Sequence, residues 1–194
     1  MGPSQDAESR RPPWRDPLLG AALVAALPVW AVLAWLQPPA AALTGAVAAP
    51  LTFLYLVLAL PILEEAAFRG LVQEGLGRLW GRRWGPLSAA NAGQAAAFTL
   101  LHLVSHPPLW AAAVLVPGLV FGFFRERHAT LASPIALHAF YNGGYFLLYP
   151  PGDTVVHYDV LGFGSLAGVD RIDLCFHVAR NRAVVLFERD VQGF

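Results

Sequence analysis

Two adjacent carboxylates and an arginine occur inside a strongly apolar segment of the chain. The stretch "PILEEAAFRG", residues 61–70, contains Glu64, Glu65 and Arg69. On a helix, Glu65 and Arg69 are i and i+4 in the favourable acid-before-base order, so each can neutralise the other. Glu64 points about 100° away from Glu65. Its own i+4 neighbour is Phe68, so Glu64 must face a group elsewhere in the protein.

Two further apolar segments carry histidines at helical spacing. "FTLLH" places Phe98 and His102 on one helical face, and "HAFYN" places His138 and Asn142 on another. Counted along each segment from its arginine-rich end, Glu64 and the two histidines lie roughly 16 to 24 Å from the same boundary. Amide hydrolysis needs a base for water and donors for the developing oxyanion. A Glu–His pair and a His–Asn pair at one depth would supply both.

The same residue types also allow a metal site. Glu64, His102 and His138 could be the three ligands of a catalytic zinc with an open water position, and His102 with His106 has the i, i+4 spacing of zincin ligands. However, "HLVSH" lacks the glutamate that follows the first histidine of HExxH, and His106 precedes two prolines. We therefore favour a metal-free glutamate mechanism without a cofactor over a zinc-dependent protease.

A third interpretation is not enzymatic. The same polar residues could form a buried brace that fixes helix register in a non-catalytic membrane binding or immunity module. Alanine replacement of Glu64 separates the two possibilities, because a brace should lose folded protein whereas a catalyst should lose turnover while remaining folded.

The composition places these residues in a membrane. The chain has 194 residues, of which 56% are hydrophobic and 13% charged, and its mean hydropathy is +0.51. Soluble domains carry about one-quarter charged residues. The 13 basic residues are balanced by 13 acids, which argues against a nucleic-acid partner. The single cysteine, Cys175, excludes an internal disulfide.

The apolar segments predict an all-α polytopic membrane helix bundle with about five transmembrane spans. We expect a disordered cytoplasmic leader at residues 1–16 and the bundle at residues 17–149. The expected spans are residues 18–36, 45–78, 86–104, 109–124 and 130–149, with Pro50 and Pro61 as a start and a kink of the second. Arginines alternate between the loops, which predicts an N-terminus inside and a C-terminus outside the membrane.

The polar tail at residues 150–194 has a different pattern. "IDLCFHVARNRAVVLFERD" contains two apolar-rich stretches around a polar turn at residues 179–182. This pattern indicates a small β-hairpin appendage, which is most simply a solvent-exposed cap without chemistry.

The three motifs together resemble a known family. "EEAAFR", "FTLLH" and "HAFYN" are similar, in order, to the EExxxR, FxxxH and HxxxN motifs of the CPBP family, the CAAX-protease and bacteriocin-processing intramembrane endopeptidases that include the Ras-converting CAAX endopeptidase. The resemblance covers about residues 50–149. It implies that Glu64 and His102 activate water, that His138 and Asn142 stabilise the oxyanion, and that Glu65, Arg69 and Phe98 support the site.

The resemblance implies a membrane-associated protein or peptide substrate, cleaved near its C-terminus. Because the motifs lie nearer the arginine-poor boundary, we expect the site to open toward the outer half of a bacterial cytoplasmic membrane. That side suits a C-terminal sorting signal, as in the myxosortase-like branch of the family. A prenylated CAAX protein would instead arrive from the cytoplasm, across about 30 Å of hydrocarbon.

Overall fold

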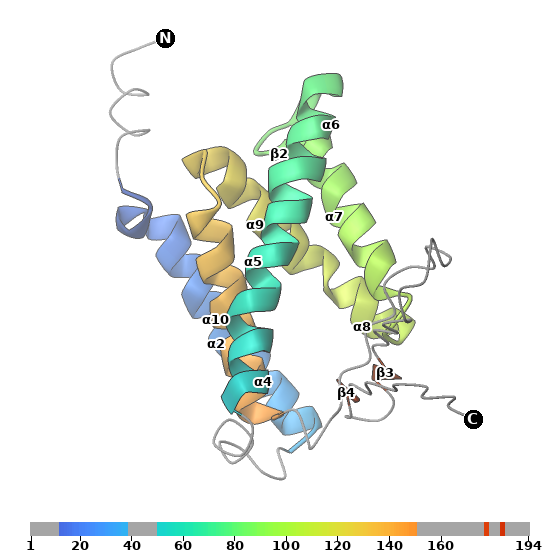
Figure 1. Cartoon of the computed structure of the whole chain (residues 1–194). Coiled ribbons are helices and arrows are strands. Elements are labelled where there is room, and N and C mark those ends of the chain that lie inside the picture. The colour runs from blue at the N-terminus through green and yellow to red at the C-terminus, as the bar shows by residue number, and fades with distance from the viewer. Residues whose placement is uncertain (1–11, 39–49, 151–176, 179–182, 185–194) are drawn as a thin grey trace, which may run out of the picture.

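The computed structural model describes residues 12–38, 50–150, 177–178 and 183–184, which form mainly a bundle of helices (Figure 1). The predicted helical fold class is therefore confirmed. In chain order, the elements are η1 (Pro13–Arg15), α2 (Pro17–Leu36), α4 (Pro50–Leu54), η2 (Tyr55–Ala59), α5 (Leu60–Glu65), η3 (Ala66–Val72), α6 (Gln73–Leu79), β1 (Arg83–Trp84), β2 (Leu87–Ser88), α7 (Ala89–His102), α8 (Pro108–Ala113), α9 (Leu115–His128), α10 (Ala132–Leu148), β3 (His177–Val178) and β4 (Ala183–Val184).

Three helical stretches are long and apolar enough to cross a bilayer: Pro17–Leu36, Pro50–Leu79 and Pro108–His128. The other two predicted spans also contain helices, but α7 has 14 residues and α10 has 17. At 1.5 Å per residue these reach roughly 21 and 26 Å, which is short of a hydrocarbon core of about 30 Å. The integral membrane character is supported, and the count of five spans stays a prediction.

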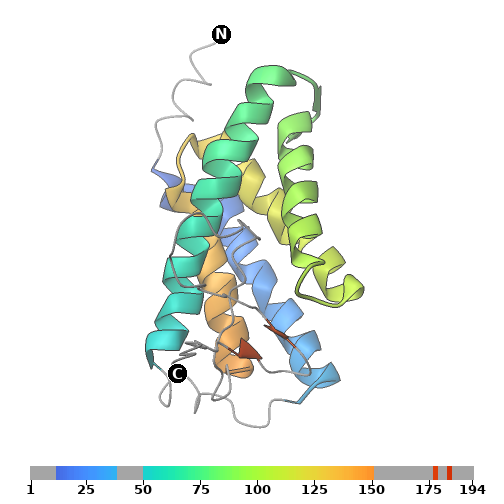
Figure 2. The ribbon, with the colours of Figure 1, turned by 45° about the vertical axis from the view of Figure 1, so that its right-hand side comes forward.

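The helices are arranged so that α10 packs against α2, α5 and α9, while α7 packs against α6, η3 and α9. Figure 2 shows α7 beside the upper part of the long helix built from α4 to α6 and α10 beside its lower part. The core beside α10 is apolar and consists of Leu19, Phe121, Phe124 and Leu137. All three motif-bearing segments therefore meet in one bundle.

The long helix contains two π-helical segments, η2 and η3, on either side of α5. The sequence predicts a kink at Pro61, because proline lacks an N–H and its ring clashes with the carbonyl four residues earlier. The helix relieves this clash one turn earlier by widening, so that the N–H of Leu60 donates to the carbonyl of Tyr55, five residues back. A π-helical turn of this kind changes the direction in which every later side chain points around the helix axis.

The start of the third helical segment differs from the prediction. A span was expected from Pro86, but β1 and β2 form a two-residue-turn hairpin and α7 begins at Ala89. Gly85 has φ +61°, a left-handed conformation that suits glycine at the first position of such a turn. The Ser88 side chain then caps α7 by accepting from the N–H of Asn91 at 2.9 Å. A turn and a cap thus occupy the residues expected to begin the span.

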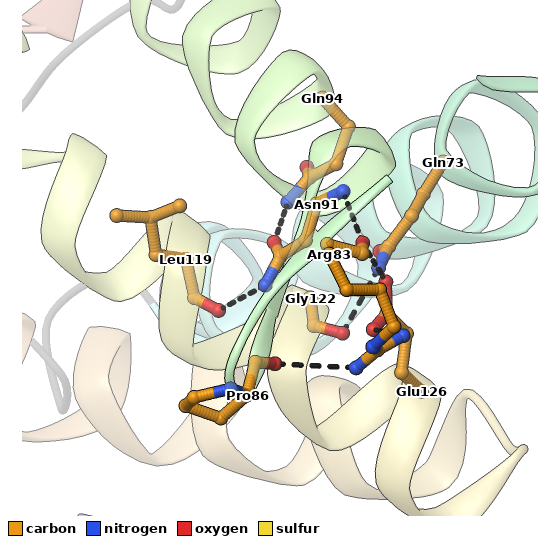
Figure 3. A network of polar contacts seen from close by, with 9 residues as sticks. Gln73, Arg83, Pro86, Asn91, Gln94, Leu119, Gly122 and Glu126 are labelled. Atoms are coloured by element: carbon orange, nitrogen blue, oxygen red, sulfur yellow. Dashed lines mark hydrogen bonds and ion pairs between the residues drawn. The ribbon is translucent and has the colours of Figure 1, made fainter. Parts of the chain in front are cut away.

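Helices α7 and α9 approach closely through a small-residue face that bears Gly118 and Gly122. The buried amides of Asn91 and Gln94 fill this contact, since Asn91 donates to the carbonyl of Leu119 at 3.0 Å and Gln94 donates to that of Gly118 at 3.0 Å. Figure 3 shows the Asn91 contact and a neighbouring network around Glu126.

The Glu126 network joins α6, α9 and the β1–β2 hairpin. Glu126 accepts from Gln73 at 2.9 Å, from Arg83 at 3.0 Å and from the hydroxyl of Ser88 (Figure 3). Gln73 lies on α6, Ser88 ends β2, and Glu126 lies on α9, so these bonds fix the three relative to one another.

A second polar contact at this end of the bundle joins α2 to α9. Asp16 caps α2 and accepts from Nε of Arg127 at 2.5 Å and from Nε2 of His128 at 2.9 Å. Of the predicted disordered leader, residues 1–11 lie outside the described residues. Residues 13–15 form the short 3₁₀ turn η1, so the last residues of the predicted leader have defined structure.

The tail contains one described pair of strands. β3 and β4 pair antiparallel, with His177 opposite Val184 and Val178 opposite Ala183. The strands lie on either side of the turn predicted at residues 179–182. The turn itself, Cys175 and the rest of the predicted appendage lie outside the described residues.

Candidate active site

Glu65 lies at the centre of the buried polar group. Its Oε1 is 3.0 Å from Nη1 of Arg69 and 2.8 Å from Nδ1 of His138, and the side chains of Glu65 and Arg69 are fully buried. The expected i, i+4 pair is thus present and extends to α10. Arg69 also donates through Nη2 to the carbonyl of Gly118 at 3.2 Å, which links the pair to α9. Glu65 therefore faces into the protein rather than toward a substrate.

Two aromatic rings enclose the Arg69 guanidinium. Its central carbon lies 4.7 Å from the ring centre of Phe98 and 5.2 Å from that of Phe121. The Phe121 ring also stacks on His138 with centroids 4.9 Å apart. The sequence motifs identified Phe98 but missed Phe121, which belongs to none of them. The Gly118-x-x-x-Gly122 spacing was the available signal that this face of α9 packs closely.

Glu64 is the more accessible of the two acids. Its Oε2 lies 3.5 Å from Nε2 of His138, and its side chain is 22% exposed whereas that of Glu65 is 0% exposed. The group that Glu64 faces is therefore His138. One imidazole ring stands between two carboxylates, and its two nitrogens point to different acids.

His102 lies at the end of α7, and its ring packs on Phe98 with centroids 4.4 Å apart. Its Nδ1 is 2.8 Å from the carbonyl oxygen of Phe98, an acceptor, so this nitrogen carries the proton. In the neutral ring, Nε2 then has a free lone pair, as a base requires. Phe98 also contacts His138, with ring centroids 6.2 Å apart. The pairing of Glu64 with His102 around a water stays a prediction.

The second histidine of "HLVSH" has a different environment. The His106 ring stacks on Trp110 with centroids 4.2 Å apart and on His102 at 5.5 Å. Its Nδ1 is 3.0 Å from the hydroxyl of Ser105, and burial lowers its pKa. His106 therefore extends the aromatic wall beside His102.

Asn142 lies one helical turn beyond His138 on α10. Its Nδ2 donates to the carbonyl of Leu56 at 3.0 Å. An amide nitrogen has two hydrogens. One therefore anchors Asn142 to the long helix, and one is left for another acceptor.

No group of three or more His, Cys, Asp or Glu side chains within the described ranges is arranged to hold a metal ion. The proposed zinc ligands Glu64, His102 and His138 do not form such a group, so we derive no step through a metal. A cavity of about 400 Å³ lies elsewhere, at the arginine-rich end, with Arg78, Arg125 and Glu126 in its lining. None of the four predicted catalytic residues lines it.

A protein-family model decides what this bundle is. The model of the Rce1-like type II CAAX prenyl endopeptidases matches residues 46–144, just over half of the chain. The chain belongs to this family. As an Rce1-like protein it is a membrane protease whose substrates are membrane-associated proteins. The matched region includes every predicted site residue from Glu64 to Asn142. Searches of curated proteins and of solved structures found no match.

Proposed function

We propose that this Rce1-like protein is a glutamate-type intramembrane endopeptidase in which Glu64 is the catalytic carboxylate. The observation that carries the proposal is the contrast between the two neighbouring acids. Glu65 is fully buried between Arg69 and His138, whereas Glu64 is partly exposed and lies 3.5 Å from Nε2 of His138. Glu65 therefore has the environment of a structural residue, whereas Glu64 can contact a substrate.

Glu64 and His102 activate the attacking water. The carboxylate of Glu64 and the unprotonated Nε2 of His102 both accept hydrogen bonds, so a water held between them gives a proton to this pair as its oxygen bonds to the peptide carbonyl carbon. The pair then returns the proton to the amine that leaves as the C–N bond breaks. The bond from Nδ1 of His102 to the Phe98 carbonyl at 2.8 Å supports this role, because it fixes both the tautomer and the ring.

His138 and Asn142 stabilise the oxyanion. His138 can donate from Nε2 only as an imidazolium, because its Nδ1 proton is directed to Glu65. In that form its Nδ1 donates to Glu65, whose carboxylate is also paired with Arg69. Asn142 supplies the second donor through its remaining amide hydrogen. Two preorganised donors of this kind form an oxyanion hole.

The proposed substrates are membrane-associated proteins cleaved near the C-terminus. The arginine-rich ends of α6 and α9 lie in the upper part of Figure 1, together with the start of α2, which supports a single cytoplasmic side. The site would then open toward the outside of a bacterial cytoplasmic membrane, where a translocated sorting signal presents its cleavage point. An impermeant thiol reagent on intact cells should label Cys175, with Cys175→Ala as control. Labelling only after permeabilisation would contradict this orientation.

Reconstituted cleavage tests the function. The purified chain in liposomes is incubated with a single-span protein that ends in an apolar anchor and a short flanking peptide, and with a prenylated CAAX peptide. Mass spectrometry of the fragments then locates any cleaved bond. We expect cleavage of the anchored protein near its C-terminus. Cleavage of neither substrate by a folded chain, at high enzyme concentration, would contradict the proposal.

A further inference from the structure

Pro61 lies in the same long helix as Glu64 but outside all three motifs. It is fully buried and follows the π-helical turn η2. In this turn the hydrogen-bond ladder runs five residues back, as the bond from the N–H of Leu60 to the carbonyl of Tyr55 shows. The next donor in that ladder would be residue 61, and its acceptor would be Leu56. Proline has no N–H, so the ladder cannot pair this carbonyl.

The carbonyl of Leu56 is satisfied by a side chain instead. Leu56 is buried, and its oxygen accepts from Nδ2 of Asn142 at 3.0 Å. Within a bilayer an unpaired carbonyl costs several kcal/mol. The Leu56 carbonyl, which has no main-chain donor, therefore holds the Asn142 amide in one orientation. We infer that Pro61 is a positioning residue for Asn142: by removing its own N–H, it reserves the Leu56 carbonyl for the Asn142 side chain.

This arrangement has a mechanistic consequence, which rests on the proposed function. An asparagine that donates one hydrogen to the main chain has its amide plane and its second hydrogen fixed. A preorganised donor does not have to reorient as charge develops on the substrate oxygen. Proline thus supplies rigidity to the oxyanion hole from a neighbouring helix.

Pro61→Ala gives the Leu56 carbonyl a main-chain donor, whichever hydrogen-bond register the helix adopts. If the π-helical turn persists, the new N–H donates to Leu56. If the turn relaxes to an α-helix, the N–H of Leu60 donates to Leu56 and that of residue 61 to Val57. In both cases Leu56 gains a main-chain partner and Asn142 loses its exclusive acceptor.

A double-mutant cycle on thermal unfolding tests the anchor without any activity measurement. Asn142→Ala should lower the Tm of the natural protein, because it leaves the Leu56 carbonyl unpaired. In the Pro61→Ala background the same change should lower the Tm by less than about half as much. Equal losses in the two backgrounds would overturn the inference.

The kinetic arm tests positioning. Pro61→Ala should reduce kcat by roughly tenfold or more with KM nearly unchanged, since a loosened oxyanion donor acts on the transition state. Pro28→Ala, which changes an exposed proline inside α2, is the matched control and should keep its kcat. A folded Pro61→Ala protein with full kcat would overturn the positioning role. If the natural protein cleaves no substrate, the proposed function fails, whereas the unfolding cycle still decides whether Pro61 anchors Asn142.

Discussion

His138 bridges Glu64 and Glu65, with Nδ1 2.8 Å from Oε1 of Glu65 and Nε2 3.5 Å from Oε2 of Glu64. The two neighbouring acids thus share one imidazole although they point in different directions from their helix. Glu65 and Arg69 hold the ring from the buried side, and Glu64 meets it from the accessible side. We therefore expect substitutions on the buried side to destabilise the fold and substitution of Glu64 to stop turnover.

Arg69→Ala should mainly reduce folded protein. The change leaves the buried carboxylate of Glu65 without its arginine partner, and breaking a buried pair costs about 3–5 kcal/mol. We expect a fall in Tm on the order of 10 °C, measured by thermal unfolding in detergent. Arg78→Ala is a matched control, because Arg78 forms an i, i+4 pair with Glu74 on the same long helix but is 76% exposed. A Tm loss for Arg69→Ala no larger than for this control would contradict the supporting role.

The contact between α7 and α9 should not tolerate a methyl group at Gly122. A Cβ there would lie 1.9 Å from Oδ1 of Asn91, whose amide is buried and hydrogen-bonded to Leu119. Gly122→Ala should therefore lower the Tm and the yield of folded protein by breaking these bonds.

Gly75→Ala is the control for this substitution, because a Cβ at Gly75 in α6 meets no atom within 4 Å. It should be neutral or stabilise the helix by up to about 1 kcal/mol. Equal Tm values for the two variants would show that the α7–α9 contact is looser than described.

Asp16 should make part of the stability depend on pH. Burial alone would raise the pKa of Asp16, but hydrogen bonds from Arg127 and His128 outweigh this and lower it from 3.8 to about 2. A carboxyl whose pKa is depressed by folding stabilises the protein above its unfolded pKa, and this contribution disappears as the pH falls through the folded value. Asp16→Asn should thus lower the Tm at neutral pH, and the difference should shrink between about pH 4 and pH 2. A constant difference across this range would contradict the contribution of the charge.

Metal removal should leave cleavage largely intact. Exhaustive chelation followed by dialysis should preserve activity, and elemental analysis of the purified protein should find far less than one zinc per chain. The physical reason is that a carboxylate and an imidazole can together take the proton of an attacking water without a metal. Stoichiometric zinc that restores a chelated, inactive enzyme would establish the metalloprotease alternative.

The sequence predicted contacts within one helix better than contacts between helices. The pair of Glu65 and Arg69 follows from i, i+4 spacing alone, and the hydrophobic segments indicated the helical bundle. The contact of Glu64 with His138 depends on how α5 and α10 are rotated, which the π-helical turn before Pro61 and the packing of the bundle determine. Hydrophobic spacing contains no information about that rotation.

One difference had a local signal that the helical pattern concealed, and two others had none that identified the contact. Gly85 and Pro86 form the turn of the β1–β2 hairpin, although the sequence interpretation treated Pro86 as a helix start. Phe121 could not be predicted as a site residue, because it reaches His138 and Arg69 from a helix without a motif. The anchor of Asn142 on Leu56 was also not predictable, since it involves a main-chain carbonyl that becomes available only in the folded helix.

Kinetics and thermal unfolding of Glu64→Gln, measured on the same preparation, test the central claim most directly. Glutamine keeps the size of the side chain and removes its basicity. We predict that kcat/KM falls at least about a hundredfold while the Tm stays near that of the natural protein. Glu74→Gln, at an exposed acid of the same long helix, should retain both. Full activity in Glu64→Gln would contradict the assignment of Glu64 as the catalytic carboxylate. So would a loss of folding that accounts for the loss of activity, as a structural brace would produce.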